Sequence, residues 1–126
     1  MKKSLLALLI ASLATGCNLL PDREVILVVQ KIEGPITAAV GSPFTVIVTV
    51  QTGGCLRFDR FSAVRSAGDV QLTARGRSAE RRGTVCTLDI RFEPQAYVVQ
   101  PPFQSPFSVI AIQPDGSTLS KQVFPP

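Results

Sequence analysis

The sequence has no histidine and no tryptophan among its 126 residues, and its one tyrosine is Tyr97. Without histidine, neither a Ser-His-Asp triad nor a Cys-His pair can be built, and a common metal ligand is missing. The chain also lacks a GxxxxGK[ST] phosphate-binding loop and a C-x-x-C redox pair. Two carboxylates could still act as in a glycosidase, but nothing in the sequence marks a converging pair. We therefore expect a protein that is not an enzyme and that holds no metal or other bound cofactor.

The first residues of the chain have the features of an export signal. Lys2 and Lys3 supply positive charge, residues 5–14 are apolar, and Ala14-Thr15-Gly16 provides small residues at the end of the apolar run. Crossing the hydrocarbon core of a bilayer takes about 20 apolar residues, and this run is much shorter before Pro21 ends it. A cleaved signal is therefore favoured over the alternative, a membrane-spanning anchor.

The end of this signal resembles a lipobox, Leu13-Ala14-Thr15-Gly16-Cys17. Bacterial lipoproteins carry this motif, and their signal peptidase cuts before a cysteine that already bears diacylglycerol. The resemblance implies cleavage between Gly16 and Cys17 and N-acylation of Cys17, so the only added groups are these covalent lipids. The alternative is an ordinary secretory signal with a cysteine at its exit. The implied organisation is a signal peptide (1–16), a lipid-anchored tether (17–23) and a folded domain (24–126).

The residue after the lipobox cysteine bears on location. The resemblance implies a protein held to a membrane of the cell envelope by its lipid anchor and facing the periplasm, and two or more acyl chains make such an attachment stable. Asn18 follows Cys17, whereas an aspartate in that position favours retention in the inner membrane in lipoproteins of enteric bacteria. We therefore expect the outer membrane rather than the inner membrane.

Two cysteines, Cys55 and Cys86, remain once Cys17 is assigned to lipidation. An exported protein is in a compartment that permits disulfides, so we expect these two to pair. The bond would close a loop of about 32 residues, which the chain-entropy model values at roughly 3 to 4 kcal/mol. The alternative is two buried free thiols. Two thiols without imidazole fall short of the four ligands of a structural zinc site.

Two stretches show the period-two alternation of half-buried strands. Residues 44–50 carry apolar side chains at the even positions. Residues 86–93 alternate more strictly, and the side chains that we expect on their buried face are those of Cys86, Leu88, Ile90 and Phe92. The disulfide is accordingly expected beneath a sheet. The other predicted strands cover residues 25–30, 56–64, 70–75, 97–100, 107–113 and 119–124.

Turn residues separate these strands, and Pro114-Asp115-Gly116 predicts a hairpin between the last two. No window after the signal has a helical period. About seven or eight short strands with frequent turns predict an all-β fold, a small antiparallel two-sheet sandwich. In strand number and size it is similar to immunoglobulin-like domains, although it lacks the buried tryptophan of antibody domains. A small β-barrel is the alternative.

Positive charge concentrates in the middle of the chain. The formal net charge is +4 and falls to +2 without Lys2 and Lys3, while residues 57–91 alone contribute +4. The densest stretch, 74–83, is predicted to connect two strands, and its candidate anion-binding residues are Arg75, Arg77, Arg81 and Arg82. The alternative is a solvated hairpin tip, which we prefer. Nucleic acid is not expected as a partner, because no aromatic residues interleave with the basic ones to stack on bases.

These observations lead to one main hypothesis and two alternatives. The main hypothesis is a lipid-anchored bacterial envelope protein whose sandwich is a non-catalytic binding or structural module, with an envelope protein or an anionic envelope polymer as partner. The first alternative is a periplasmic enzyme inhibitor. The second is a module that binds an anionic glycan or lipid through the arginine-rich stretch.

Overall fold

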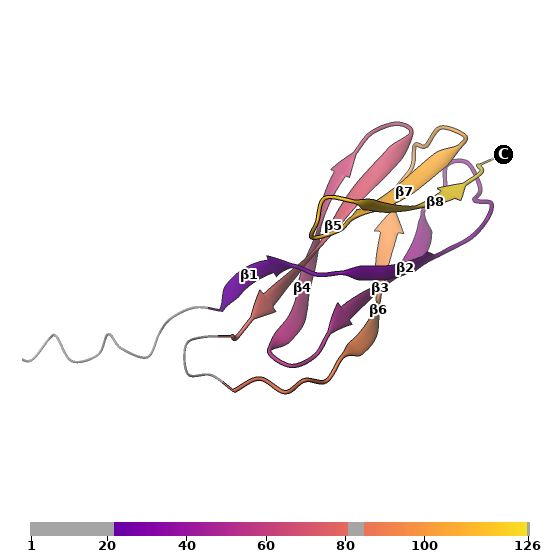
Figure 1. The fold of residues 1–126 in the computed structure, drawn as a ribbon. Coiled ribbons are helices and arrows are strands. Elements are labelled where there is room, and N and C mark those ends of the chain that lie inside the picture. Colours follow the sequence, from indigo (N-terminus) through magenta and orange to yellow (C-terminus); the bar gives the residue numbers. More distant parts are fainter. Residues whose placement is uncertain (1–21, 81–84, 126) are drawn as a thin grey trace, which may run out of the picture.

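The computed structural model describes residues 22–80 and 85–125, which form eight β-strands in two sheets and no helix (Figure 1). The predicted all-β, two-sheet sandwich is confirmed, since the two sheets stay separate. The strands are β1 (Arg23–Ile26), β2 (Val29–Glu33), β3 (Phe44–Thr52), β4 (Leu56–Arg65), β5 (Asp69–Ser78), β6 (Arg91–Val99), β7 (Phe107–Ile112) and β8 (Thr118–Val123).

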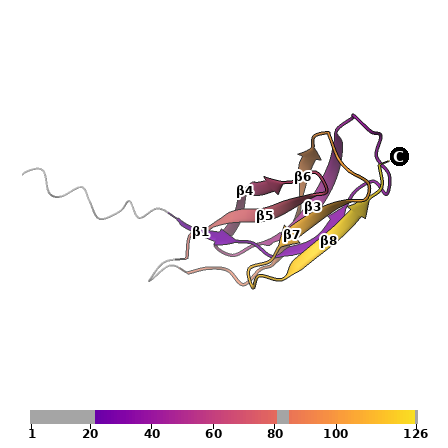
Figure 2. The same cartoon turned by 90° about the horizontal axis from the view of Figure 1, so that it is seen from above.

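The larger sheet is organised around β5. Strand β4 pairs with it as an antiparallel neighbour on one side. Strands β1 and β7 pair with different halves of β5, β1 antiparallel and β7 parallel, and β8 adds to β7. The smaller sheet has the order β2-β3-β6. In the view from above, β4 and β8 lie on opposite sides of the molecule (Figure 2).

The core lies between the two sheets, and β3 supplies a large part of it. Its even-numbered residues from Phe44 to Val50 are all buried, as the alternation predicted. Across from them, β5 and β7 contribute their own alternating apolar residues. Two buried faces of period two therefore meet, which is what holds a sandwich together. The buried residues from these two strands are Val70, Leu72, Ala74, Phe107, Val109 and Ala111.

The N-terminal run 25–30, predicted as one strand, is divided between the two sheets. The Leu27 amide still donates to the Ala74 carbonyl of the larger sheet at 2.9 Å, whereas the Val28 carbonyl accepts from the Gln51 amide of the smaller sheet at 2.9 Å. The buried Leu27 side chain lies where the chain passes from one sheet to the other. This continuous run, which forms β1 and then β2, therefore connects the two sheets.

The hairpin between β7 and β8 is confirmed. The Gly116 amide donates to the Gln113 carbonyl at 3.0 Å, and Gly116 has the positive φ of 86° that glycine adopts easily. Asp115 accepts hydrogen bonds from the amide and the hydroxyl of Ser117 at 2.9 and 2.6 Å, which lowers the pKa of Asp115. The Pro-Asp-Gly signal thus has the local chemistry of a tight turn.

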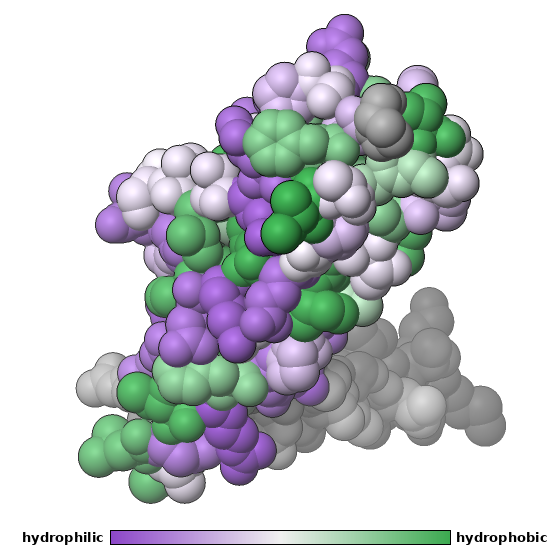
Figure 3. Space-filling model, turned by 90° about the vertical axis from the view of Figure 1, so that its right-hand side faces the viewer, coloured by the Kyte–Doolittle hydropathy of each residue, from purple (hydrophilic) through white to green (hydrophobic). Residues whose placement is uncertain are grey.

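The buried face predicted for residues 86–93 is wrong. Strand β6 begins only at Arg91, and within it the residues that turn inward are odd-numbered, including Tyr97 and the buried Val99. Leu88, Ile90 and Phe92 are exposed, and Leu88 is 99% exposed. The reason is that residues 85–90 run outside both sheets, so no second layer covers their apolar side chains. Figure 3 shows hydrophobic surface, in green, at the lower end of the molecule.

Candidate functional site

The residues predicted as sites fall partly within the described residues. Gly16 and Cys17, the predicted cleavage and lipidation positions, lie outside them. Arg81 and Arg82, two of the candidate anion-binding residues, also lie outside. The structure describes the disulfide cysteines and the other two arginines. Arg77 and Arg75 lie opposite Glu24 and Ile26 of β1, and Cys55 is bonded to Cys86.

Arg75 and Arg77 lie within strand β5, which corrects the prediction that residues 74–83 are a connection. Gly76 between them is the physical reason, because it faces inward at a point of very close packing. A Cβ atom on Gly76 would lie 2.7 Å from the Leu27 side chain and 2.7 Å from the Arg57 carbonyl oxygen. The glycine therefore marks a tightly packed strand, and the two arginine side chains point away from the core.

Both arginines have carboxylate partners on neighbouring strands. Arg75 Nε lies 4.0 Å from Glu24 Oε1 and donates to Ser62 Oγ at 3.1 Å. Arg77 Nε lies 3.5 Å from Asp59 Oδ2. Each of these side chains is about a third exposed or more, so the pairs are worth no more than about 1 kcal/mol each. Their guanidinium groups are nevertheless engaged by carboxylates of the same chain.

Two further arginines extend this charged face onto β4. Arg60 bridges Asp59 at 2.8 Å and Glu24 at 3.1 Å, and Arg57 pairs with Asp22 at 3.0 Å. Across the ladder, Arg57 is opposite Arg77 and Arg60 is opposite Arg75. Like charges in such positions repel, and the carboxylates between them offset that repulsion. A hollow of about 540 Å³ in this face is lined by Asp22, Arg57, Phe58, Asp59 and Arg77.

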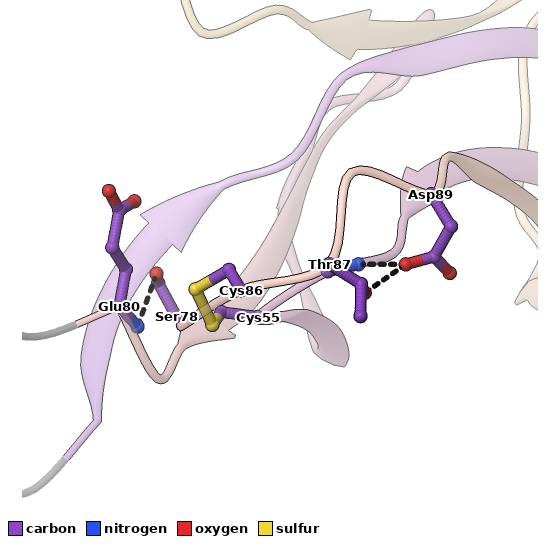
Figure 4. The surroundings of a disulfide bond; sticks show 7 residues. Cys55, Ser78, Glu80, Cys86, Thr87 and Asp89 are labelled. Carbon is purple, nitrogen blue, oxygen red and sulfur yellow. Dashed lines mark hydrogen bonds between the residues drawn. A yellow bond between two sulfur atoms is a disulfide. The ribbon is translucent and has the colours of Figure 1, made fainter. Parts of the chain in front are cut away.

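The disulfide between Cys55 and Cys86 is confirmed, with Cα atoms 5.3 Å apart (Figure 4). It lies at the end of the sandwich, where both cysteines are half-buried, rather than beneath a sheet as predicted. The Cys55 carbonyl accepts from the Ala79 amide at 3.0 Å. The bond thus ties the segment that leads into β6 to the start of β4 and the end of β5.

Asp89 holds the same segment in place through its carboxylate. Asp89 Oδ1 accepts from the Thr87 hydroxyl and from the Gly54 amide, the latter at 3.1 Å (Figure 4). Asp89 Oδ2 pairs with Arg91 Nε at 3.0 Å. The hydrogen bond from Thr87, followed by that from Gly54 and by the charge of Arg91, lowers the pKa of Asp89 below 3.8. Gly53 has a φ of 114° and no room for a Cβ beside the Asp89 carbonyl. Residues 86–90 therefore follow a defined path.

Four side chains on or directly beside this path, Val85, Leu88, Ile90 and Phe92, form what we call the apolar tip. They are 94%, 99%, 63% and 51% exposed. The sequence did not indicate this surface, because the alternation of Leu88, Ile90 and Phe92 predicts one face of a half-buried strand and Val85 lies outside that predicted strand. A defined segment that exposes several large apolar side chains is typical of an interaction site.

Within residues 22–80 and 85–125, no helix is long and apolar enough to cross a membrane. The same residues contain no group of three or more acidic or cysteine side chains placed to hold a metal ion. Comparison with protein-family models, with curated protein sequences and with solved structures finds no match for this chain.

Proposed function

We propose that this chain is a lipid-anchored bacterial cell-envelope protein whose β-sandwich is a non-catalytic binding or structural module. The observation that carries the proposal is the lipobox-like sequence Leu13-Ala14-Thr15-Gly16-Cys17. Cleavage before Cys17 and acylation of that residue attach the domain to the membrane, and Asn18 in the next position favours the outer membrane. Two or more acyl chains are enough for a stable attachment without a spanning helix.

Two features of the described residues support this proposal. The Cys55–Cys86 disulfide suits an oxidising compartment such as the periplasm, because thiols in the cytosol are kept reduced. Strand β1 begins at Arg23, a few residues after Cys17, which is a suitable length for a tether between an acylated cysteine and a folded domain. The carboxylate partners of Arg75 and Arg77 favour a structural role for these arginines.

Acylation of Cys17 tests the proposal directly. Cells that express the chain are fed labelled palmitate, and the protein is followed through membrane fractionation. We expect the native chain to take up label and to sediment with membranes, and Cys17→Ala to lose the label and keep residues 1–16. The matched control replaces the other two cysteines, Cys55→Ala with Cys86→Ala, and should still be labelled. Normal processing of Cys17→Ala, with no label in the native chain, would refute the proposal.

A further inference from the structure

The apolar tip is held in its exposed position rather than left there by a loose loop. The disulfide fixes Cys86, three hydrogen-bonding partners hold Asp89, and β6 begins immediately afterwards at Arg91. Between and beside these fixed points, Val85 and Leu88 are more than nine-tenths exposed. Large apolar side chains that are this exposed are unfavourable in water, and burying them in an apolar environment is favourable. The arrangement therefore suits a partner that is itself apolar at the contact.

The tip lies at the end of the sandwich where the chain enters from the proposed anchor. Arg23 at the start of β1 pairs with Ser78 at the end of β5. The next residue, Ala79, donates its amide to Cys55, and Cys55 is bonded to Cys86. Figure 1 shows the chain entering β1 at this same end, whereas the C-terminus lies at the other.

The length of the tether limits how far this end can be from the membrane. Five residue steps separate Cys17 from Asp22, the first described residue, and they span at most about 18 Å when fully extended. Strand β4, with ten residues, is about 33 Å long. An acylated Cys17 thus keeps the tip end of the domain next to the bilayer, where a short tether produces a high effective concentration of lipid.

We propose that the apolar tip docks on the phospholipid bilayer that holds the anchor, with Val85 and Leu88 entering the interfacial region and Ile90 and Phe92 beside them. This inference rests on the proposed acylation of Cys17. The bilayer fits better than a second copy of the chain because the tether presents the tip to lipid continuously. The one carboxylate within the tip segment, Asp89, already has its oxygens bonded by protein donors, so docking brings no unpaired carboxylate to the membrane.

The absence of tryptophan from the chain provides a sensitive test. Leu88→Trp places a single indole on the tip, and Ile36→Trp places one at a residue 70% exposed in the loop between β2 and β3, at the other end of the sandwich (Figure 1). Neither substitution touches the core. The acylated full chain is purified from membranes and reconstituted into vesicles of phosphatidylethanolamine and phosphatidylglycerol that contain brominated phosphatidylcholine. We expect a blue shift and loss of emission from Leu88→Trp, and unchanged emission from Ile36→Trp.

Flotation of the vesicles separates failure of the inference from failure of the proposed function. If both variants float with the vesicles and brominated lipid quenches neither indole, the docking is refuted and the anchor stands. If neither variant is acylated and neither floats, the proposed function fails and the docking fails with it. If acrylamide quenches the Leu88→Trp indole on vesicles as strongly as it quenches the Ile36→Trp indole, the tip is exposed to water and the docking is refuted.

Discussion

Removing the disulfide should lower the free energy of unfolding by about 3.7 kcal/mol at 25 °C, a large part of the ~5 to 15 kcal/mol of a small domain. The perturbation is the pair of substitutions Cys55→Ser and Cys86→Ser. The crosslinked residues are 31 positions apart, and the chain-entropy relation gives about 3.7 kcal/mol for a loop of that size. Both cysteines are half-buried at the end of the sandwich and belong to no core cluster. Lost packing therefore adds little.

Urea unfolding of residues 18–126 measures this loss. Far-UV circular dichroism follows the sheets, and fluorescence follows Tyr97, whose ring lies 5.8 Å from that of Phe61 between the two sheets. The midpoint should fall and the m-value should rise, because the unfolded chain expands once the crosslink is gone. Reduction of the native disulfide should reproduce the change. A loss below about 1 kcal/mol in a two-state transition with an unchanged m-value would refute the loop-entropy reasoning.

Three further predictions concern packing, backbone and pH. Val48→Ala removes two carbon atoms from a fully buried side chain and should lower the free energy of unfolding by about 2 kcal/mol. Val64→Ala, at a residue 67% exposed, should change it by less than about 0.5 kcal/mol. Equal urea midpoints for the two variants would contradict this prediction. Gly53→Ala should lower the free energy of unfolding by more than about 2 kcal/mol, because a positive φ and a clash with the Asp89 backbone act together. Gly41→Ala, where φ is 81° but the Cβ would meet nothing, should lower it by about 1 kcal/mol. Because the folded pKa of Asp89 is below 3.8, its stabilisation is present at neutral pH and is lost as the pH falls from 3.8 through that lowered pKa. Asp89→Asn should flatten the acid limb of the stability curve, and an acid limb like that of the native chain would be evidence against the carboxylate's role.

Period-two alternation predicted β3 correctly and failed for residues 86–93, although the second alternation is the stricter one. Alternation shows that the two faces of a segment differ, but not that another layer covers one of them. Strand β3 is central in its sheet and faces β5 and β7 across the core, whereas residues 86–90 run outside the sheets. In β6 the pairing with β3 turns Tyr97 and Val99 inward, and no local pattern reveals that register.

The arginine-rich stretch 74–83 also shows that local sequence does not reveal which distant residues will lie beside a candidate site. Glycines towards both ends and small residues in the middle predict that residues 74–83 connect two strands. Gly76 is instead required by the close approach of Leu27, which is distant in the sequence. The carboxylates that neutralise the two arginines also come from other strands. The disulfide was predicted from the two cysteines that remain once Cys17 is assigned to lipidation in an exported protein. Its position at the end of the sandwich could not be predicted, because it depends on the whole fold.

The passage of the N-terminal run from one sheet to the other has a mechanical consequence. Under the proposed acylation of Cys17, tension from the membrane would reach the domain through β1. The hydrogen bonds of an antiparallel pair are perpendicular to the strands, so a pull along β1 loads its bonds to β5 together, in shear, rather than breaking them one after another. Beyond Leu27 the same run pairs with β3. Force that overcomes the first sheet is therefore passed to the second before the domain can be peeled open.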